Sequence, residues 1–130
     1  MNAETSQAGP GLRVLVVEDN QELAENLFEF LEPRGFVLDH AGDGVTGLHL
    51  AVVNHYDVIV LDLTLPDMSG FELLERLHAN DQYEAVPVVI YTGKDLTRDE
   101  EARLRKYADR IILKTERSHE RLLNEASLFL

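Results

Sequence analysis

The stretch Asp57-Val-Ile-Val-Leu-Asp62 decides the fold class, because four apolar residues in a row lead directly into a carboxylate. An apolar run this short, rich in β-branched residues, is typical of a strand that is covered on both faces of a parallel sheet. Three other apolar runs also lead into polar residues: Arg13–Val17 into Glu18 and Asp19, Val86–Tyr91 into Thr92 and Gly93, and Arg110–Leu113 into Lys114. The carboxyl ends of the strands in an open parallel sheet share one edge, so these polar groups are expected to meet in one crevice.

Helical patterns separate the apolar runs. We expect strands at 13–17, 36–40, 57–61, 87–91 and 110–113, and helices at 20–33, 44–54, 69–79, 97–107 and 117–129. Five alternating strand–helix units predict right-handed crossovers and an α/β, doubly wound parallel sheet. The strand at 36–40 mixes polar and apolar residues, which favours a place at the edge of that sheet.

Composition narrows the class of protein. A chain of 130 residues that is 45% hydrophobic and 28% charged is expected to form one folded domain over residues 12–130, preceded by a polar, disordered tail over residues 1–11. The chain has no cysteine, which excludes disulfides and thiolate metal sites. No apolar run approaches the ~20 residues of a membrane span, so we expect a cytoplasmic protein. The net charge of −12 argues against direct binding of nucleic acid, which requires a basic face.

The residues at the strand ends suit a divalent cation and a phosphoryl group. Magnesium prefers oxygen ligands and retains several waters, so Asp19 and Asp62 can each supply one oxygen while Glu18 acts through water. Without a cation, three neighbouring acids would raise one another's pKa. An aspartate freed for attack is a competent nucleophile for an acyl phosphate. Thr92 can donate a hydrogen bond to one phosphoryl oxygen, and Lys114 can pair with another.

Each of these residues also has an ordinary structural explanation. Glu18 and Asp19 can cap the first helix, Asp62 and Thr92 can belong to turns, and Lys114 can be a solvated surface lysine. The combination of four strand ends with complementary chemistry is much more specific than any single member. The five histidines, at positions 40, 49, 55, 78 and 119, show no metal-ligand spacing and are expected at the surface or at the sheet edge.

The motifs that carry this chemistry resemble those of the receiver domain of two-component response regulators, over essentially all of residues 12–130. They are Val14-Leu-Val-Val-Glu-Asp-Asn20, Asp57-Val-Ile-Val-Leu-Asp-Leu-Thr-Leu-Pro-Asp-Met-Ser-Gly70, Val88-Val-Ile-Tyr-Thr-Gly93 and Ile112-Leu-Lys114. The resemblance implies a flavodoxin-like (βα)5 fold with strand order 2-1-3-4-5. It also implies phosphorylation of Asp62 by a histidine kinase or a histidine phosphotransfer protein.

The same resemblance implies a Mg²⁺ site formed by Glu18, Asp19, Asp62 and the backbone carbonyl of Thr64, with Thr92 and Lys114 contacting the phosphoryl group. The domain would be a signalling module rather than an enzyme, although it would catalyse its own phosphorylation and dephosphorylation. It would act as a monomer or a weak homodimer. The C-terminal half, from Tyr91-Thr-Gly-Lys-Asp-Leu96 onward, resembles receivers of hybrid histidine kinases.

Two positions depart from the family pattern. The family often has an aromatic residue three places before the lysine, where this chain has Ile111, which has no ring to swing. The family usually has a cis proline after the lysine, where this chain has Thr115, and a cis bond without proline costs about 2.5–4 kcal/mol.

Three other classes of protein share part of this pattern. A haloacid-dehalogenase-type phosphatase needs a second acid two residues after the nucleophile, where this chain has Thr64. A flavodoxin-like electron carrier needs a Ser/Thr/Gly-rich loop after the first strand, where this chain has Glu18-Asp-Asn-Gln-Glu22. A phosphorylation-independent binding module of the receiver fold has no such conflict with the sequence and is the main alternative.

Overall fold

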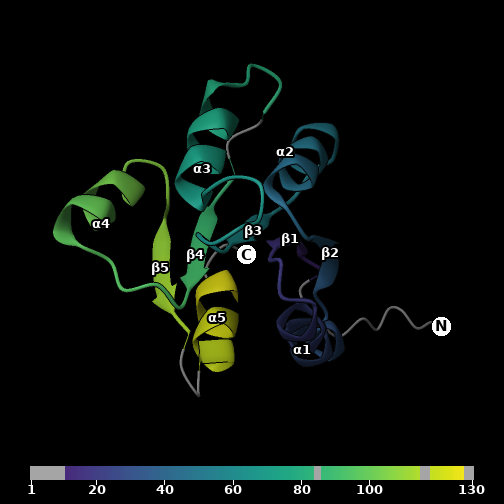
Figure 1. Ribbon diagram of the computed structural model, residues 1–130. Coiled ribbons are helices and arrows are strands. Elements are labelled where there is room, and N and C mark those ends of the chain that lie inside the picture. Colours follow the sequence, from purple (N-terminus) through teal and green to yellow (C-terminus); the bar gives the residue numbers. More distant parts are fainter. Residues whose placement is uncertain (1–10, 84–85, 115–117, 128–130) are drawn as a thin grey trace.

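The computed structural model describes residues 11–83, 86–114 and 118–127, and within these residues strands and helices alternate along the chain (Figure 1). The strands are β1 (Arg13–Val17), β2 (Val37–Ala41), β3 (Val58–Leu61), β4 (Val88–Thr92) and β5 (Arg110–Leu113). The helices are α1 (Gln21–Leu31), α2 (Gly44–Val53), α3 (Gly70–Ala79), α4 (Arg98–Leu104) and α5 (Ser118–Ser127), and a short 3₁₀ turn, η1 (Glu32–Arg34), follows α1.

The five strands form one parallel sheet in the order β2-β1-β3-β4-β5. Helices α1 and α5 cover one face of the sheet, and α2 and α3 cover the other, with α4 beside β5 (Figure 1). The doubly wound fold, the strand order and the edge position of the second strand are therefore confirmed. The chain reverses its winding direction between β2 and β3, so β1 and β3 lie side by side at the point where ligands bind in such sheets.

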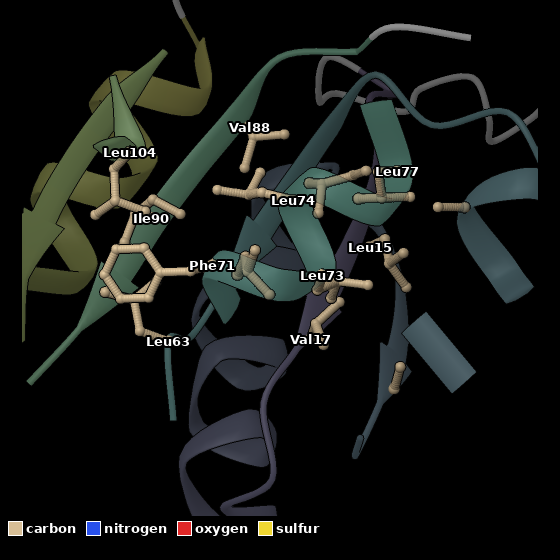
Figure 2. Packing of buried hydrophobic residues seen from close by; sticks show 14 of the residues in the cluster. Leu15, Val17, Leu63, Phe71, Leu73, Leu74, Leu77, Val88, Ile90 and Leu104 are labelled. Atoms are coloured by element: carbon tan, nitrogen blue, oxygen red, sulfur yellow. The ribbon is translucent and has the colours of Figure 1, made fainter. Parts of the chain in front are cut away.

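Two hydrophobic layers hold the helices on the sheet, because alternate residues of each strand point to opposite faces. In β1, Leu15 and Val17 pack toward α3, whereas Val14 and Val16 pack toward α1. Figure 2 shows the first of these layers, where Leu73 and Leu74 of α3 lie over β1 and β3. Complete burial of each such side chain contributes roughly 1.5–3 kcal/mol, so packing on both faces holds the central strands in place where they present the groups at their ends.

The element boundaries differ from the predictions by a few residues, for local reasons. The predicted helix 20–33 ends at Leu31, because Pro33 follows in a 3₁₀ turn and Gly35 then takes a left-handed conformation at φ 96°. Asn20 caps this helix by accepting a hydrogen bond from the Leu23 amide, which leaves Glu18 and Asp19 free for another role. The predicted helix 97–107 is shorter, at 98–104.

Some predictions lie outside the described residues. Apart from Gly11, these include the disordered tail over residues 1–11, the peptide bond between Lys114 and Thr115, and the last residues of the predicted helix 117–129. Among the helices in the described part of the chain, none has the length and apolarity that a bilayer span requires.

Candidate functional site

Three carboxylates meet at the carboxyl edge of the sheet. Glu18 and Asp19 directly follow β1, and Asp62 directly follows β3. The register pairs Val17 with Leu61, so the residues after them emerge side by side. One carboxylate oxygen from each of the three acids lies within 4.8 Å of the others. Glu18 and Asp62 are buried, at 2% and 6% exposure, whereas Asp19 is exposed and faces the solvent side of the cluster.

Lys114 links the two buried acids. Its ammonium donates hydrogen bonds to Glu18 Oε1 at 2.7 Å and to Asp62 Oδ2 at 3.2 Å. The same nitrogen lies 5.7 Å from the centroid of the Tyr91 ring, within range of a cation–π contact. A lysine 52 residues away from Asp62 in sequence is therefore a direct neighbour of the carboxylate.

Burial and the neighbouring charges shift the pKa values of both Glu18 and Lys114. Burial raises the pKa of Glu18 above its usual value, although hydrogen bonds from Lys114 and the Asn20 amide act to lower it. Burial acts to lower the pKa of Lys114, but the hydrogen bond and negative charge of Glu18, together with Asp62, raise it overall. The ammonium is thus held firmly in its charged form, and it is the counter-charge of the two buried acids.

Thr92 and Thr64 take up the remaining predicted positions. Thr92 ends β4 and is fully buried, and its hydroxyl oxygen accepts a hydrogen bond from the Lys94 amide at 3.1 Å. Its carbonyl accepts from the Lys114 amide at 2.8 Å, which ties the ends of β4 and β5 together. The amide of Thr64 approaches Asp62 Oδ1 at 3.4 Å, while the Thr64 side chain is exposed. The structure thus places all the predicted side chains at one edge of the sheet.

The loop between β3 and α3 is held tightly against Asp62. A Cβ atom at Gly70 would come within 2.7 Å of the Asp62 carbonyl oxygen and of Leu63 Cα, so only glycine fits without a shift of the backbone. The Gly70 amide donates to the Leu63 carbonyl at 2.9 Å, which closes the loop. The closed loop holds the backbone of Thr64 beside the Asp62 carboxylate.

Two residues that contribute to the site were not predicted as such. Asp67 accepts hydrogen bonds from the amides of Gly44 and Val45 at 2.7 and 2.9 Å, and so fastens the β3–α3 loop to the start of α2. These two bonds lower the pKa of the Asp67 carboxyl. His40 lies on the edge strand, as predicted for the histidines, but its ring is half-buried and contacts the Glu18 carbonyl at 2.7 Å. No sequence spacing marks either contact, because both join segments about 22 residues apart.

The donor set fits a hard cation. Three carboxylates supply only oxygen ligands, one of them exposed to solvent, which suits a Mg²⁺ ion that keeps part of its water shell. The Lys114 ammonium already neutralises the two buried acids in part. An arriving cation would therefore add to, or replace, a positive charge that is already present.

Comparisons with known proteins point to one family. The family model described as "Response regulator receiver domain" matches residues 14–126. The chain is 38% identical over 82 residues to the probable transcriptional regulatory protein SilR of Salmonella typhimurium, a match that covers 63% of this chain and 35% of SilR. It is 38% identical over 103 residues to the transcriptional activator protein IrlR of Burkholderia pseudomallei, covering 79% of this chain and 44% of IrlR. The chain thus spans less than half the length of these relatives.

Solved structures agree with this result. The receiver domain of the Francisella response regulator 1452 superposes with a TM-score of 0.81 at 29% identity, covering 91% of this chain and 95% of that one. The receiver domain of the sensor histidine kinase PA1611 of Pseudomonas aeruginosa, described with a magnesium ion in its active-site cleft, superposes with a TM-score of 0.80 over 92% of this chain and 97% of that one. At 24% identity, the second likeness shows a shared fold.

Proposed function

Because the chain belongs to the response regulator receiver domain family of two-component signalling, we propose that Asp62 accepts a phosphoryl group from a histidine kinase or a histidine phosphotransfer protein in a Mg²⁺-dependent reaction. The observation that carries this proposal is the position of Asp62. Its carboxylate lies at the end of the central strand β3, beside two further acids, and it shares the Lys114 ammonium with Glu18.

In the proposed reaction a carboxylate oxygen of Asp62 attacks the phosphorus atom of the donor. The O–P bond to Asp62 forms as the bond from phosphorus to the donor nitrogen or oxygen breaks, and the electron pair of the broken bond stays on the leaving group. Lys114 needs to move little to pair with a phosphoryl oxygen, because it already lies 3.2 Å from Asp62 Oδ2. The Thr92 hydroxyl accepts from the Lys94 amide and so keeps its own hydrogen to donate to a second phosphoryl oxygen.

Glu18, Asp19, Asp62 and the Thr64 carbonyl are the groups that we propose hold the cation. A bound Mg²⁺ would neutralise the acids and the developing charge on the phosphoryl oxygens. The exposed Asp19 is proposed as a direct ligand, because it is the acid that solvent and an arriving ion reach first. Autodephosphorylation, in which water attacks the phosphorus atom and releases Asp62, completes the proposed cycle.

The test of this function is direct phosphorylation. The protein is incubated with Mg²⁺ and acetyl phosphate or phosphoramidate, and the added mass is located by peptide mass spectrometry. One labile phosphoryl group is expected on Asp62, and Asp62→Asn should stay folded and unreactive. Asp95→Asn, which changes an exposed acid in the loop after β4, is the matched control and should react as the wild type does. Modification of another residue would refute the assignment to Asp62, and no reaction with any donor would leave a phosphorylation-independent binding module as the better explanation.

The cation site has its own test. Mg²⁺ should raise the melting temperature by mass action, since it binds the folded protein. Asp19→Ala should weaken Mg²⁺ binding and raise the melting temperature of the metal-free protein, because it removes one of three neighbouring like charges. If Asp19→Ala binds Mg²⁺ as well as the wild type does, the ligand assignment is wrong.

The output of the domain is proposed to be read close to Asp62. Ile111 of β5 is half-buried against the core layer of α3 and α4, and its side chain has no ring that could exchange between two positions. Beryllofluoride, a mimic of the phosphoryl group, should therefore shift amide NMR signals mainly near the strand ends. Large shifts spread over α4 and β5, or dimerisation upon activation, would contradict this proposal.

The domain itself is proposed to be a monomer or weak homodimer in the cytoplasm, with residues 1–11 as a tail and residues 12–130 as the folded unit. Its net charge of −12 favours protein partners over nucleic acid for this part of the protein. The relatives that it matches include proteins described as transcriptional regulators, and the match covers 35% of SilR and 44% of IrlR.

A further inference from the structure

We propose that His40 is a positioning residue for the cation site, because its ring fixes the peptide group from which Asp19 emerges. This inference rests on the proposed function and adds a residue from the neighbouring edge strand. His40 lies on β2 opposite Val16 of β1. From there its Nε2 reaches the carbonyl oxygen of Glu18 at 2.7 Å. This short contact joins the edge strand to the acidic loop, residues 18–20 between β1 and α1.

The direction of the hydrogen bond follows from its chemistry. A carbonyl oxygen can only accept, so the hydrogen must lie on Nε2 of the histidine and the ring is the donor. The ring is also held by Phe28 of α1, whose centroid lies 6.4 Å away at an interplanar angle of 79°, an edge-to-face arrangement. Two elements, β2 and α1, therefore determine where the donor points.

The other groups of Glu18 are fixed elsewhere. Its amide donates to the Ala41 carbonyl at 2.9 Å, and its carboxylate accepts from the Asn20 amide at 3.1 Å and from Lys114 at 2.7 Å. The carbonyl is the group that His40 holds, and it belongs to the same rigid peptide plane as the Asp19 amide. Fixing that plane fixes the direction in which the exposed Asp19 leaves the strand, and hence how its carboxylate meets Glu18 and Asp62.

Loss of this donor should act on cation affinity rather than on chemistry. Partners that orient metal ligands from outside the coordination shell typically change metal affinity by about 10–100-fold when mutated. His40 acts on a backbone carbonyl one residue away from the proposed ligand, so we expect an effect near the lower limit, about 10-fold. The maximal rate of phosphorylation at saturating Mg²⁺ should stay close to that of the wild type, because His40 contacts neither Asp62 nor Lys114 through any hydrogen bond that the structure describes.

The experiment compares His40→Gln with His40→Leu. Glutamine keeps an N–H donor at a similar distance from the backbone, whereas leucine keeps the bulk and loses the donor. Mg²⁺ alone is titrated into each metal-free protein, and binding is followed by the amide NMR signals of the acidic loop. His40→Leu should raise the Mg²⁺ dissociation constant by about 10-fold, and His40→Gln should stay within about 3-fold of the wild type.

Two readouts separate positioning from general stability. The melting temperature of each metal-free variant shows whether the fold is damaged, and the dependence of phosphorylation on Mg²⁺ concentration should show a raised half-saturation point with an unchanged plateau in His40→Leu. Equal Mg²⁺ affinities in the wild type and His40→Leu, or equal losses in His40→Leu and His40→Gln, overturn the role of His40. A wild-type protein that binds Mg²⁺ but never takes a phosphoryl group would refute the proposed function instead, and the ratio of dissociation constants would still decide the role of His40.

Discussion

Replacement of Lys114 by methionine is the most informative perturbation of the metal-free protein. Methionine keeps most of the apolar stem and removes the ammonium that bridges Glu18 and Asp62. The two carboxylate side chains are only 3% and 7% exposed, so water cannot replace the lost partner efficiently. We therefore expect Lys114→Met to be strongly destabilising in the absence of a cation.

The size of the loss follows from burial. Removing one partner of a buried ion pair costs about 3–5 kcal/mol. The Lys114 side chain is 23% exposed, so part of its interaction is already screened, and we expect about 2–3 kcal/mol. The unfolding entropy of about 2.1 cal/mol/K per residue gives roughly 0.25 kcal/mol/K for the proposed folded unit, residues 12–130. The melting temperature should therefore fall by about 8–12 °C.

The assay is thermal unfolding followed by circular dichroism in the presence of EDTA. Lys94→Met is the matched control, since Lys94 is exposed and pairs with Glu100 at 3.0 Å on the surface, and its loss should leave the melting temperature nearly unchanged. Adding Mg²⁺ should stabilise Lys114→Met more than the wild type, because the cation then supplies the missing positive charge. A fall no larger than that of Lys94→Met would refute the view that Lys114 is the counter-charge of the site.

The pH dependence of this variant gives a second check. Burial raises the pKa of Glu18 in the folded protein. Ionisation of Glu18 therefore lowers the free energy of unfolding as the pH rises from the usual glutamate pKa through this raised pKa, and the penalty is absent at lower pH. Without Lys114 the pKa of Glu18 should rise further. The stability deficit of Lys114→Met should therefore be largest at neutral pH and should shrink as Glu18 takes up a proton.

Three further predictions concern two residues near the site and one at the opposite end of the sheet. Gly70→Ala should destabilise by about 1–3 kcal/mol in urea unfolding, because its Cβ would meet backbone atoms at 2.7 Å, whereas Gly42→Ala, with nothing within 4 Å, should stay within about 0.5 kcal/mol. Asp67→Asn should have a lower free energy of unfolding than the wild type at neutral pH. This difference should begin to shrink as the pH falls below 3.8, the ordinary pKa of an aspartate, and should vanish once the pH is below the lowered pKa that Asp67 has in the folded protein. The Tyr56 hydroxyl donates to Asp39 at 2.7 Å, and burial and this bond raise its pKa to about 12, so the wild type should lose stability from pH 10 upward and Tyr56→Phe should lack that loss.

The sequence predicted the fold well because its strongest signals are local. Four apolar runs followed by polar residues, together with the mixed run at 36–40, gave all five strands to within about one residue. The alternation of strands and helices was sufficient for the doubly wound architecture. Since that architecture gathers strand ends at one edge, the neighbourhood of Asp62, Asp19 and Lys114 could also be predicted without any knowledge of side-chain contacts.

The side-chain contacts within the site could not be predicted from the sequence. The pattern placed Lys114 near a future phosphoryl group, but it did not indicate that the ammonium bridges Glu18 and Asp62 in the metal-free protein. Nothing in the sequence singled out Asp67, and only the approach of α2 makes it an acceptor for two amides. The role of His40 depends on the register of β2 against β1, which a sequence pattern of mixed polarity specifies weakly.

The bridging lysine affects how strongly an external cation would bind to the two buried acids. The ammonium of Lys114 is a tethered ion, so its effective concentration at Glu18 and Asp62 is set by the fold and does not change when the solution is diluted. Mg²⁺, in contrast, arrives from a bulk pool whose concentration varies. Binding of Mg²⁺, as proposed above, would therefore depend on how strongly the tethered ammonium holds the same two carboxylates. A substitution that weakens or strengthens the contacts of Lys114 with Glu18 and Asp62 should change the Mg²⁺ concentration at which the site is half-occupied.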